Sequence, residues 1–147
     1  MIECNIYKNT NADSKYYGKW YPRNEPKGIV DLDGLAQHMA EHNTPFSKGV
    51  IYGVLTDMVN CIRELTLEGK SVKIANLALF KCNISGLPAN DPGTISLNTH
   101  IAAVRLVAQA TGHFTKAELA KDARFRWTSK AQAEIDKWKE EHEQPEP

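Results

Sequence analysis

The stretch SKGVIYGVLTDMVNCIRELTLEGKSVKIANLALF, residues 47–80, decides the fold. Its first part predicts a helix that begins at Ser47, a residue type that caps helix N-termini, and ends at Gly69, the residue type that follows helix C-termini. Between these limits, apolar residues recur at the spacing of one helix face: Val50, Ile51, Val54, Leu55, Met58, Cys61, Ile62 and Leu65. The helix that carries this stripe spans about six turns, and its apolar face is more than one small sheet covers, which indicates that a second copy of the chain packs against it.

After Gly69 the apolar period changes to two, which is the spacing of strands. Residues 71–75 and 79–84 fit two strands that are joined by a tight turn at Asn76. Alternation puts Lys73 and Lys81 on one face and sorts these apolar side chains to the other: Val72, Ile74, Phe80, Cys82 and Ile84. The turn formers of residues 85–94, SGLPANDPGT, then predict a long loop or a projecting arm.

The segment from Ile101 to Gln109 fits two different elements. Its residues Ile101, Val104 and Ala108 have helical spacing, whereas the alternation of Ala102, Val104, Leu106 and Ala108 suits a strand face. In the strand interpretation, Arg105 lies on the same face as the two lysines.

The flanking segments carry weaker patterns. Residues 1–30 are rich in Asn, Lys and Tyr, which predicts an irregular arm with one strand around residues 17–21, and Asp31 is the expected cap of a short amphipathic helix that extends to Asn43. Capping boxes at residues 115–118 and 129–132 predict a short helix and then a polar tail helix that ends near His142, with a frayed end at residues 143–147.

The composition of the 147 residues is that of one folded domain, with 41% hydrophobic and 24% charged residues. This excludes a collagen-like or disordered chain. No apolar stretch is long enough to cross a membrane, and the acidic residue at position 3 argues against a signal peptide, so a cytoplasmic location is expected. The three cysteines, Cys4, Cys61 and Cys82, are odd in number and lack zinc-binding spacing, and are expected to be buried thiols.

The formal net charge of zero hides an uneven distribution. Residues 30–69 hold two bases and six acids, and residues 129–147 hold three bases and six acids. Residues 70–128 instead hold eight bases and three acids. A polyanionic partner is therefore compatible with this block, although its attraction to the whole chain is weaker than to a strongly basic protein.

The predicted order of two helices, a two-stranded hairpin, an arm, a returning strand and a short helix resembles the HU/IHF family of DNA-bending proteins over residues 17–127. The most specific parts are the helix motif from Ser47 to Leu65, the turn Glu68-Gly69-Lys70, and Val72-Lys73-Ile74 with Asn76-Leu77-Ala78-Leu79-Phe80, where Ala78 replaces the family's usual Gly. Residues 17–23 and 30–32 resemble the N-terminal extension of a Bacteroides-type HU-like subgroup. Ile101-Ala102-Ala103-Val104-Arg105 resembles the returning strand of that subgroup, which favours the strand interpretation.

The resemblance implies an α+β fold with a projecting arm and an intertwined homodimer, in which double-stranded DNA lies across a sheet saddle between two arms. On this interpretation residues 1–16 are an N-terminal arm, residues 17–128 an HU-like DNA-binding domain and residues 129–147 a polar helical tail. The expected phosphate contacts are Lys73, Lys81 and Arg105, with Lys70 in the turn. The three cations Lys73, Lys81 and Arg105 make six in a dimer, which predicts a slope of roughly −5 for log affinity against log salt. Residues 90–94 partly resemble the arm signature of the family, so Pro92, ahead of Pro88, is the candidate for its intercalating proline, or is an ordinary loop residue.

Two features of the sequence bear on other functions. Between Lys81 and Arg105 there is no Lys or Arg, only His100, whereas arms of the family are rich in both. This favours an alternative: an HU-fold structural or protein-interaction module that has lost DNA binding. His38 to His42 matches the zinc motif HxxEH, but no third ligand follows, and solvent-facing histidines are the favoured interpretation.

The prediction is therefore a non-catalytic protein of the nucleoid without cofactor, metal, small-molecule substrate or membrane partner. One further cluster, Tyr16, Tyr17, Trp20 and Tyr21, has two interpretations. These aromatic side chains either stack nucleic-acid bases or, as is commoner, pin a strand to the edge of a core.

Overall fold

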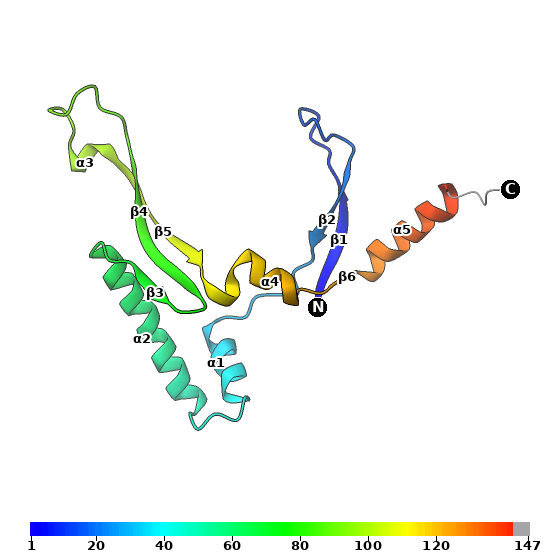
Figure 1. The fold of residues 1–147 in the computed structure, drawn as a ribbon, viewed down its shortest axis with the longest axis horizontal. Coiled ribbons are helices and arrows are strands. Elements are labelled where there is room, and N and C mark those ends of the chain that lie inside the picture. Colours follow the sequence, from blue (N-terminus) through cyan, green and yellow to red (C-terminus); the bar gives the residue numbers. More distant parts are fainter. Residues whose placement is uncertain (143–147) are drawn as a thin grey trace. The chain divides into compact units, whose positions relative to one another are not determined.

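The computed structural model describes residues 1–142, which form two compact units. One unit combines residues 1–29 with the chain from Ala120 onward, and the other contains Val30–Leu119. Each combines helical segments with a three-stranded sheet, in the orders β2-β1-β6 and β3-β4-β5, so the fold is mixed α+β (Figure 1). The two compact units therefore do not coincide with the predicted N-terminal arm, HU-like domain and polar tail. That residues 17–128 act as one functional domain stays a prediction.

Two helices begin the second unit as the sequence predicts. Helix α1 (Leu32–Ala40) is capped by Asp31, whose side chain accepts a hydrogen bond from Gly34, and it ends three residues before the expected limit at Asn43. Helix α2 (Lys48–Leu67) is capped by Ser47, and Gly69 follows it with a φ of +82°. The left-handed φ at Gly69 is the conformation that favours glycine after a helix end.

The sheet of this unit is antiparallel throughout. Strand β3 (Val72–Ile74) turns at Asn76, which has a φ of +59°, into β4 (Ala78–Gly86), and β4 pairs along its length with β5 (Ile101–Ala110). The strand interpretation of residues 101–109 is thus confirmed. The β4–β5 hairpin extends beyond the α1–α2 pair, and its end carries residues 87–96 and the short helix α3 (Leu97–His100), which the sequence analysis missed (Figure 1).

A tight turn follows β5 at Gly112, the first residue of a 3₁₀ turn (Gly112–Phe114). This turn leads to α4 (Lys116–Asp122). Gly112 has a φ of +55°, and a Cβ placed there would lie 2.8 Å from the Cα of Asn76 and collide with its side-chain oxygen. This close approach of two backbones requires glycine.

Replacing Gly112 by alanine is therefore expected to lower the free energy of unfolding of this unit by about 2 kcal/mol or more, because strain at positive φ adds to the clash. Thermal unfolding followed by helical circular dichroism measures the loss. The matched control is Gly49→Ala near the start of α2, where the added methyl meets open space. That control should be neutral or gain up to about 1 kcal/mol from helix propensity.

The first unit contains two strands that the sequence did not predict, one near each end of the chain. Strand β1 (Ile2–Lys8) lies in the middle of its sheet, so the prediction of an irregular arm was wrong for these residues. It pairs antiparallel with β2 (Trp20–Asn24) and parallel with β6 (Phe125–Trp127), which joins the two ends of the chain. Helix α5 (Ser129–His142) follows, and Thr128 rather than Ser129 caps it. The expected frayed end, residues 143–147, lies outside the described residues.

An ion-pair cluster ties the ends of this unit together. Arg126 donates to Oε1 of Glu3 from two guanidinium nitrogens, and the Lys27 ammonium lies 3.2 Å from the same oxygen. The hydrogen bond from Arg126, followed by that from Lys27, holds the pKa of Glu3 below its usual 4.5.

A lowered carboxylate pKa stabilises the fold above the unfolded pKa, and that stabilisation is lost as the pH falls through the folded pKa. We therefore expect the melting temperature of this unit to fall below about pH 4.5 and Glu3→Gln to flatten that dependence. All three tryptophans, Trp20, Trp127 and Trp138, belong to this unit, so their fluorescence reports its unfolding separately. An unchanged pH profile in Glu3→Gln would contradict the assignment.

The described residues bury little apolar volume. The buried hydrophobic residues are Ala36, Ile51, Ala78 and Ala131, and no large side chain among residues 1–142 is fully buried. Val54 on α2 is 64% exposed, and its neighbour on the stripe, Val50, is 52% exposed. Cys61 on the same helix is exposed and Cys4 and Cys82 are half-buried, so the expectation of buried thiols was wrong for the single chain. None of the described helices is long and apolar enough to cross a membrane.

Candidate nucleic-acid interface

The three predicted phosphate contacts lie on one face of the β3-β4-β5 sheet. Cross-strand partners share a face: Lys73 faces Leu79, Lys81 faces Val107, and Asn83 faces Arg105. Residues 79, 81 and 83 alternate along β4, so all three pairs project to the same side. The sheet thus brings the cations together from three different strands.

The surroundings of these cations leave their charge available. Lys73 and Arg105 are exposed, whereas Lys81 is half-buried in the single chain. Within residues 1–142, none of the three forms an ion pair with a carboxylate. Arg105 donates a hydrogen bond to the hydroxyl of Ser85, a neutral partner that orients the guanidinium without cancelling its charge.

Lys70 differs from the other predicted contacts. Its ammonium lies 2.6 Å from a carboxylate oxygen of Glu68, two residues away in the turn after α2. Because both side chains are exposed, this ion pair is weak and can exchange for a phosphate contact. Lys70 therefore contributes less free charge than the three cations of the sheet.

The opposite face of the same sheet is apolar. Strand alternation gives it the residues Val72, Ile74, Ala78, Phe80, Cys82, Ile84, Val104, Leu106, Ala108 and Ala110. Toward the arm these side chains are uncovered: Ile84 is 63% and Leu106 60% exposed. An apolar area of this kind, next to the exposed stripe of α2, marks an interaction surface rather than the outside of a finished core.

Pro92 lies away from the cations, in the loop between the ends of β4 and α3. The loop folds on itself, because the side chain of Asp91 accepts a hydrogen bond from the backbone of Gly93 and its carbonyl accepts one from the hydroxyl of Thr94. Pro92 is exposed in this turn. The most exposed apolar side chain nearby is Leu97, at 78%, which the sequence analysis did not single out.

The HxxEH motif is an exposed histidine pair. His38 and His42 lie one turn apart on and just after α1, with their Nε2 atoms 3.0 Å apart. Among residues 1–142, no three or more His, Cys, Asp or Glu side chains form a cluster that could hold a metal ion. Two histidines without a further ligand do not make the site of a metallohydrolase.

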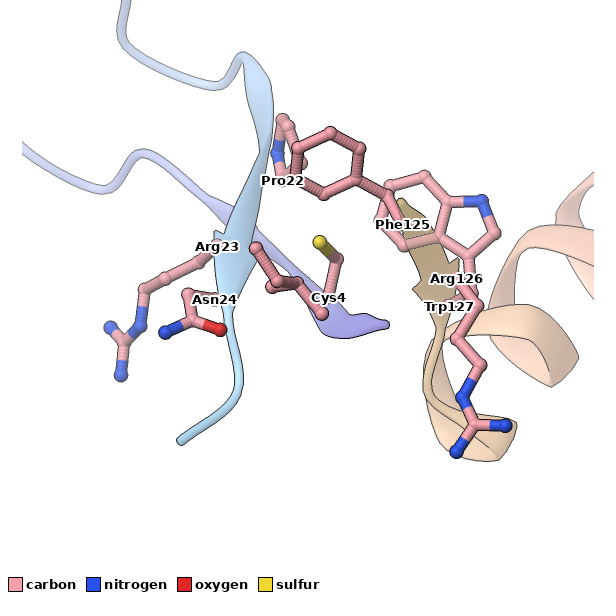
Figure 2. Close-up of a pocket in the computed structure, with 8 residues that line it drawn as sticks. Cys4, Pro22, Arg23, Asn24, Phe125, Arg126 and Trp127 are labelled. Atoms are coloured by element: carbon pink, nitrogen blue, oxygen red, sulfur yellow. The ribbon is translucent and has the colours of Figure 1, made fainter. Parts of the chain in front are cut away.

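The unit that contains both chain ends has its own apolar hollow, of about 740 Å³. Figure 2 shows Cys4 between Pro22, Phe125 and Trp127, while the guanidinium groups of Arg23 and Arg126 point away from the hollow. These apolar residues lie on one face of the β2-β1-β6 sheet by register. The alternation of Ile2, Cys4 and Ile6 was the sequence signal that could have revealed β1 and this face.

The aromatic cluster near the N-terminus is divided between the loop that joins β1 to β2 and strand β2 itself. Tyr17 is 62% exposed and Trp20 53% exposed, in and beside the loop that joins β1 to β2. The favoured interpretation was therefore wrong for the loop residues Tyr16 and Tyr17, whereas Tyr21 is half-buried and Trp20 lines an apolar hollow with Ile135 and Trp138 of α5.

An α+β domain with a helix pair and a long antiparallel hairpin is the architecture expected from the HU-like resemblance. A comparison with family models agrees: residues 1–121 match the family of HU domains fused to wHTH, Ig or glycine-rich motifs, and this chain belongs to that family.

A solved structure from Bacteroides vulgatus, described as a "Putative bacterial DNA binding protein", is similar with a TM-score of 0.64 at 14% sequence identity. The similarity covers 86% of this chain and 47% of the other, so the present chain spans about half the length of that protein. At this identity the likeness concerns the fold. No curated protein matches the sequence.

Proposed function

We propose that this protein is a non-catalytic, HU-like DNA-binding protein that contacts the phosphate backbone of double-stranded DNA through Lys73, Lys81 and Arg105. The proposal rests on one observation: strand pairing places these three cations on the same face of the sheet. None of them has a carboxylate partner among the described residues. Family membership and the description of the Bacteroides vulgatus neighbour support the same function. Contacts to phosphates carry no sequence information, so sequence specificity is low.

The acting form in this proposal is a homodimer. The exposed half of the α2 stripe and the apolar face of the β3-β4-β5 sheet support it, because a single chain leaves both in water. A symmetric dimer buries the same patch twice and doubles the cations on the sheet to six. Lys70 adds a weaker contact at the edge, since it must first leave Glu68.

The arm supplies the contacts that bend DNA in this proposal. Pro92 at the turn of the arm is the candidate wedge at a base step, where a protein partially unstacks DNA and gains contact area from the bend. The arm has no Lys or Arg to hold a wrapped duplex. We therefore infer that the protein bends DNA only slightly. As a DNA-binding protein, it would act in the nucleoid of the cytoplasm.

Fluorescence anisotropy with a labelled duplex, at two or more salt concentrations, tests this function. Six phosphate contacts per dimer predict a slope of log affinity against log salt of roughly −5. Two duplexes of unrelated sequence should bind with similar affinity. Absence of binding at low salt, or a slope near zero, would contradict the proposal.

The arm contains no Lys or Arg, which favours a second candidate, an HU-fold protein-interaction module that does not bind DNA. Its exposed aliphatic residues, Leu87, Ile95 and Leu97, suit contact with protein better than contact with phosphate. This candidate predicts a dimer that binds no duplex even at low salt. The anisotropy experiment therefore separates the two functions directly.

A further inference from the structure

The hairpin of β1 and β2 carries an unusual combination of positive charge and exposed aromatic rings. Residues 5–24 hold four bases, Lys8, Lys15, Lys19 and Arg23, and one acid, Asp13, a net charge of +3. They also hold five aromatic residues: Tyr7, Tyr16, Tyr17, Trp20 and Tyr21. None of the four bases forms an ion pair with another described residue. The charge of the hairpin is therefore available to an anionic ligand.

Each cation of the hairpin except Lys19 lies next to a ring. The ammonium of Lys15 is 4.8 Å from the ring centre of Tyr16, that of Lys8 is 5.9 Å from Trp20, and the guanidinium carbon of Arg23 is 6.0 Å from Tyr7. These pairings put a group that attracts phosphate beside a flat apolar surface. A ligand that is both charged and aromatic satisfies the two at once.

One face of the hairpin presents a stacked pair. Tyr7 and Tyr21 are cross-strand partners, with ring centres 5.7 Å apart and planes inclined by 30°. Arg23 has the parity of these tyrosines, whereas Ile6 and Trp20 have the other parity and line a hollow with Ile135 and Trp138 of α5. Glu3 shares the tyrosine face, but Arg126 and Lys27 neutralise its charge.

Hydrogen bonds within the loop between the two strands link its two sides. Backbone hydrogen bonds join Asn9 to Lys19 and to Gly18, and the hydroxyl of Ser14 accepts from the side chain of Asn9 and the backbone of Tyr16. Gly18 adopts a φ of +76° that permits this turn. Such internal hydrogen bonds reduce the entropic cost of ordering Lys15, Tyr16 and Tyr17 on binding.

We propose that the β1–β2 hairpin is a second nucleic-acid site, which binds single-stranded DNA by stacking unpaired bases on its tyrosines and pairing phosphates with Lys15, Lys19 and Arg23. Duplex DNA keeps its bases stacked on one another, so it offers these rings little. An acidic peptide matches the charge but leaves the rings without flat partners. The site consists of other residues than the cations of the β3-β4-β5 sheet and does not depend on their proposed function.

Anisotropy of a labelled oligodeoxythymidylate of about 15 nucleotides, titrated with the full chain, tests the site. The probe should bind, and a matched oligomer of abasic nucleotides should bind at least about tenfold more weakly, since it keeps the phosphates and lacks the bases. Failure of the oligodeoxythymidylate to bind at low salt, or equal binding of the abasic oligomer, would overturn the proposal.

The variant Tyr16→Ala/Tyr17→Ala changes only loop side chains and should weaken oligodeoxythymidylate binding by roughly 10- to 100-fold while leaving duplex binding unchanged. Tyr52→Ala is the matched control, because Tyr52 is the tyrosine outside the hairpin and is similarly exposed on α2. Lys15→Glu/Lys19→Glu should weaken binding of the same probe and make its affinity less dependent on salt, because fewer counterions are released, whereas Lys130→Glu on α5 should change neither. Unchanged binding in either hairpin variant would contradict the assignment.

The variant Lys73→Gln/Lys81→Gln/Arg105→Gln separates the two proposals. It should keep its affinity for the single strand while its duplex affinity falls. If it loses both, the single strand binds to the sheet and the hairpin site is excluded. If the wild type binds the single strand but no duplex, the hairpin site stands and the proposed function of the sheet fails.

Discussion

Replacing Val54 by aspartate is expected to convert the protein into a monomer and to unfold much of the unit formed by residues 30–119. Val54 lies on the apolar stripe of α2 and is 64% exposed in the single chain, so in the proposed dimer the partner covers it. A carboxylate there would lose its hydration without gaining a partner, at a cost of at least about 3 kcal/mol per site. Symmetry places two such sites in one interface.

Sedimentation equilibrium measures the change in association, and helical circular dichroism measures the accompanying loss of structure. Asn60→Asp is the matched control, because it adds the same charge to another side of the same helix. The control should remain dimeric. In the wild type, the melting temperature should rise with protein concentration, as it does for a dimer with a marginal monomer. A wild type that is monomeric at all concentrations, or a dimeric Val54→Asp, would contradict the proposed interface.

The second large effect is expected from Lys73→Gln/Lys81→Gln/Arg105→Gln, which should weaken duplex binding at low salt by a factor on the order of 10³ and bring the salt slope from roughly −5 close to zero. Each substitution removes a charge that releases a counterion from the phosphates in every subunit. The fold should be retained, since none of the three side chains is fully buried. Anisotropy across a series of salt concentrations gives both quantities.

The control for this variant removes the same charge from other elements, in Lys116→Gln/Lys130→Gln/Lys139→Gln on α4 and α5. If the net charge of the protein governs DNA binding, both triple variants lose affinity equally. If the sheet face governs it, the control keeps most of its slope. Equal losses would refute the sheet as the binding face.

The spacing of apolar residues predicted the helices and strands in which that spacing repeats several times. The cap at Ser47, the stripe of α2 and the alternation around Asn76 each depend on neighbours in sequence, and all three are present. The segment from Ile101 to Gln109 fits both periods, and the resemblance to a family decided correctly for a strand. Its pairing with β4 is a long-range contact that local pattern does not encode.

The unit that joins the chain ends was missed for the same reason. The parallel pairing of Ile2 with Phe125 spans nearly the whole chain, and β6 is three residues long. Its ion pair between Glu3 and Arg126 likewise has no local signature. The charges of the candidate interface followed from strand parity, whereas the pairing of Lys70 with Glu68 needed coordinates.

The most direct test of the central claim is the composition of the complex with DNA. Sedimentation velocity of the wild-type protein with a short labelled duplex at low salt measures both the protein state and the number of chains on the duplex. The account predicts a dimer before addition of DNA and two chains on each duplex at saturation. A duplex that sediments alone in the presence of excess protein, or one that carries single chains, would contradict it.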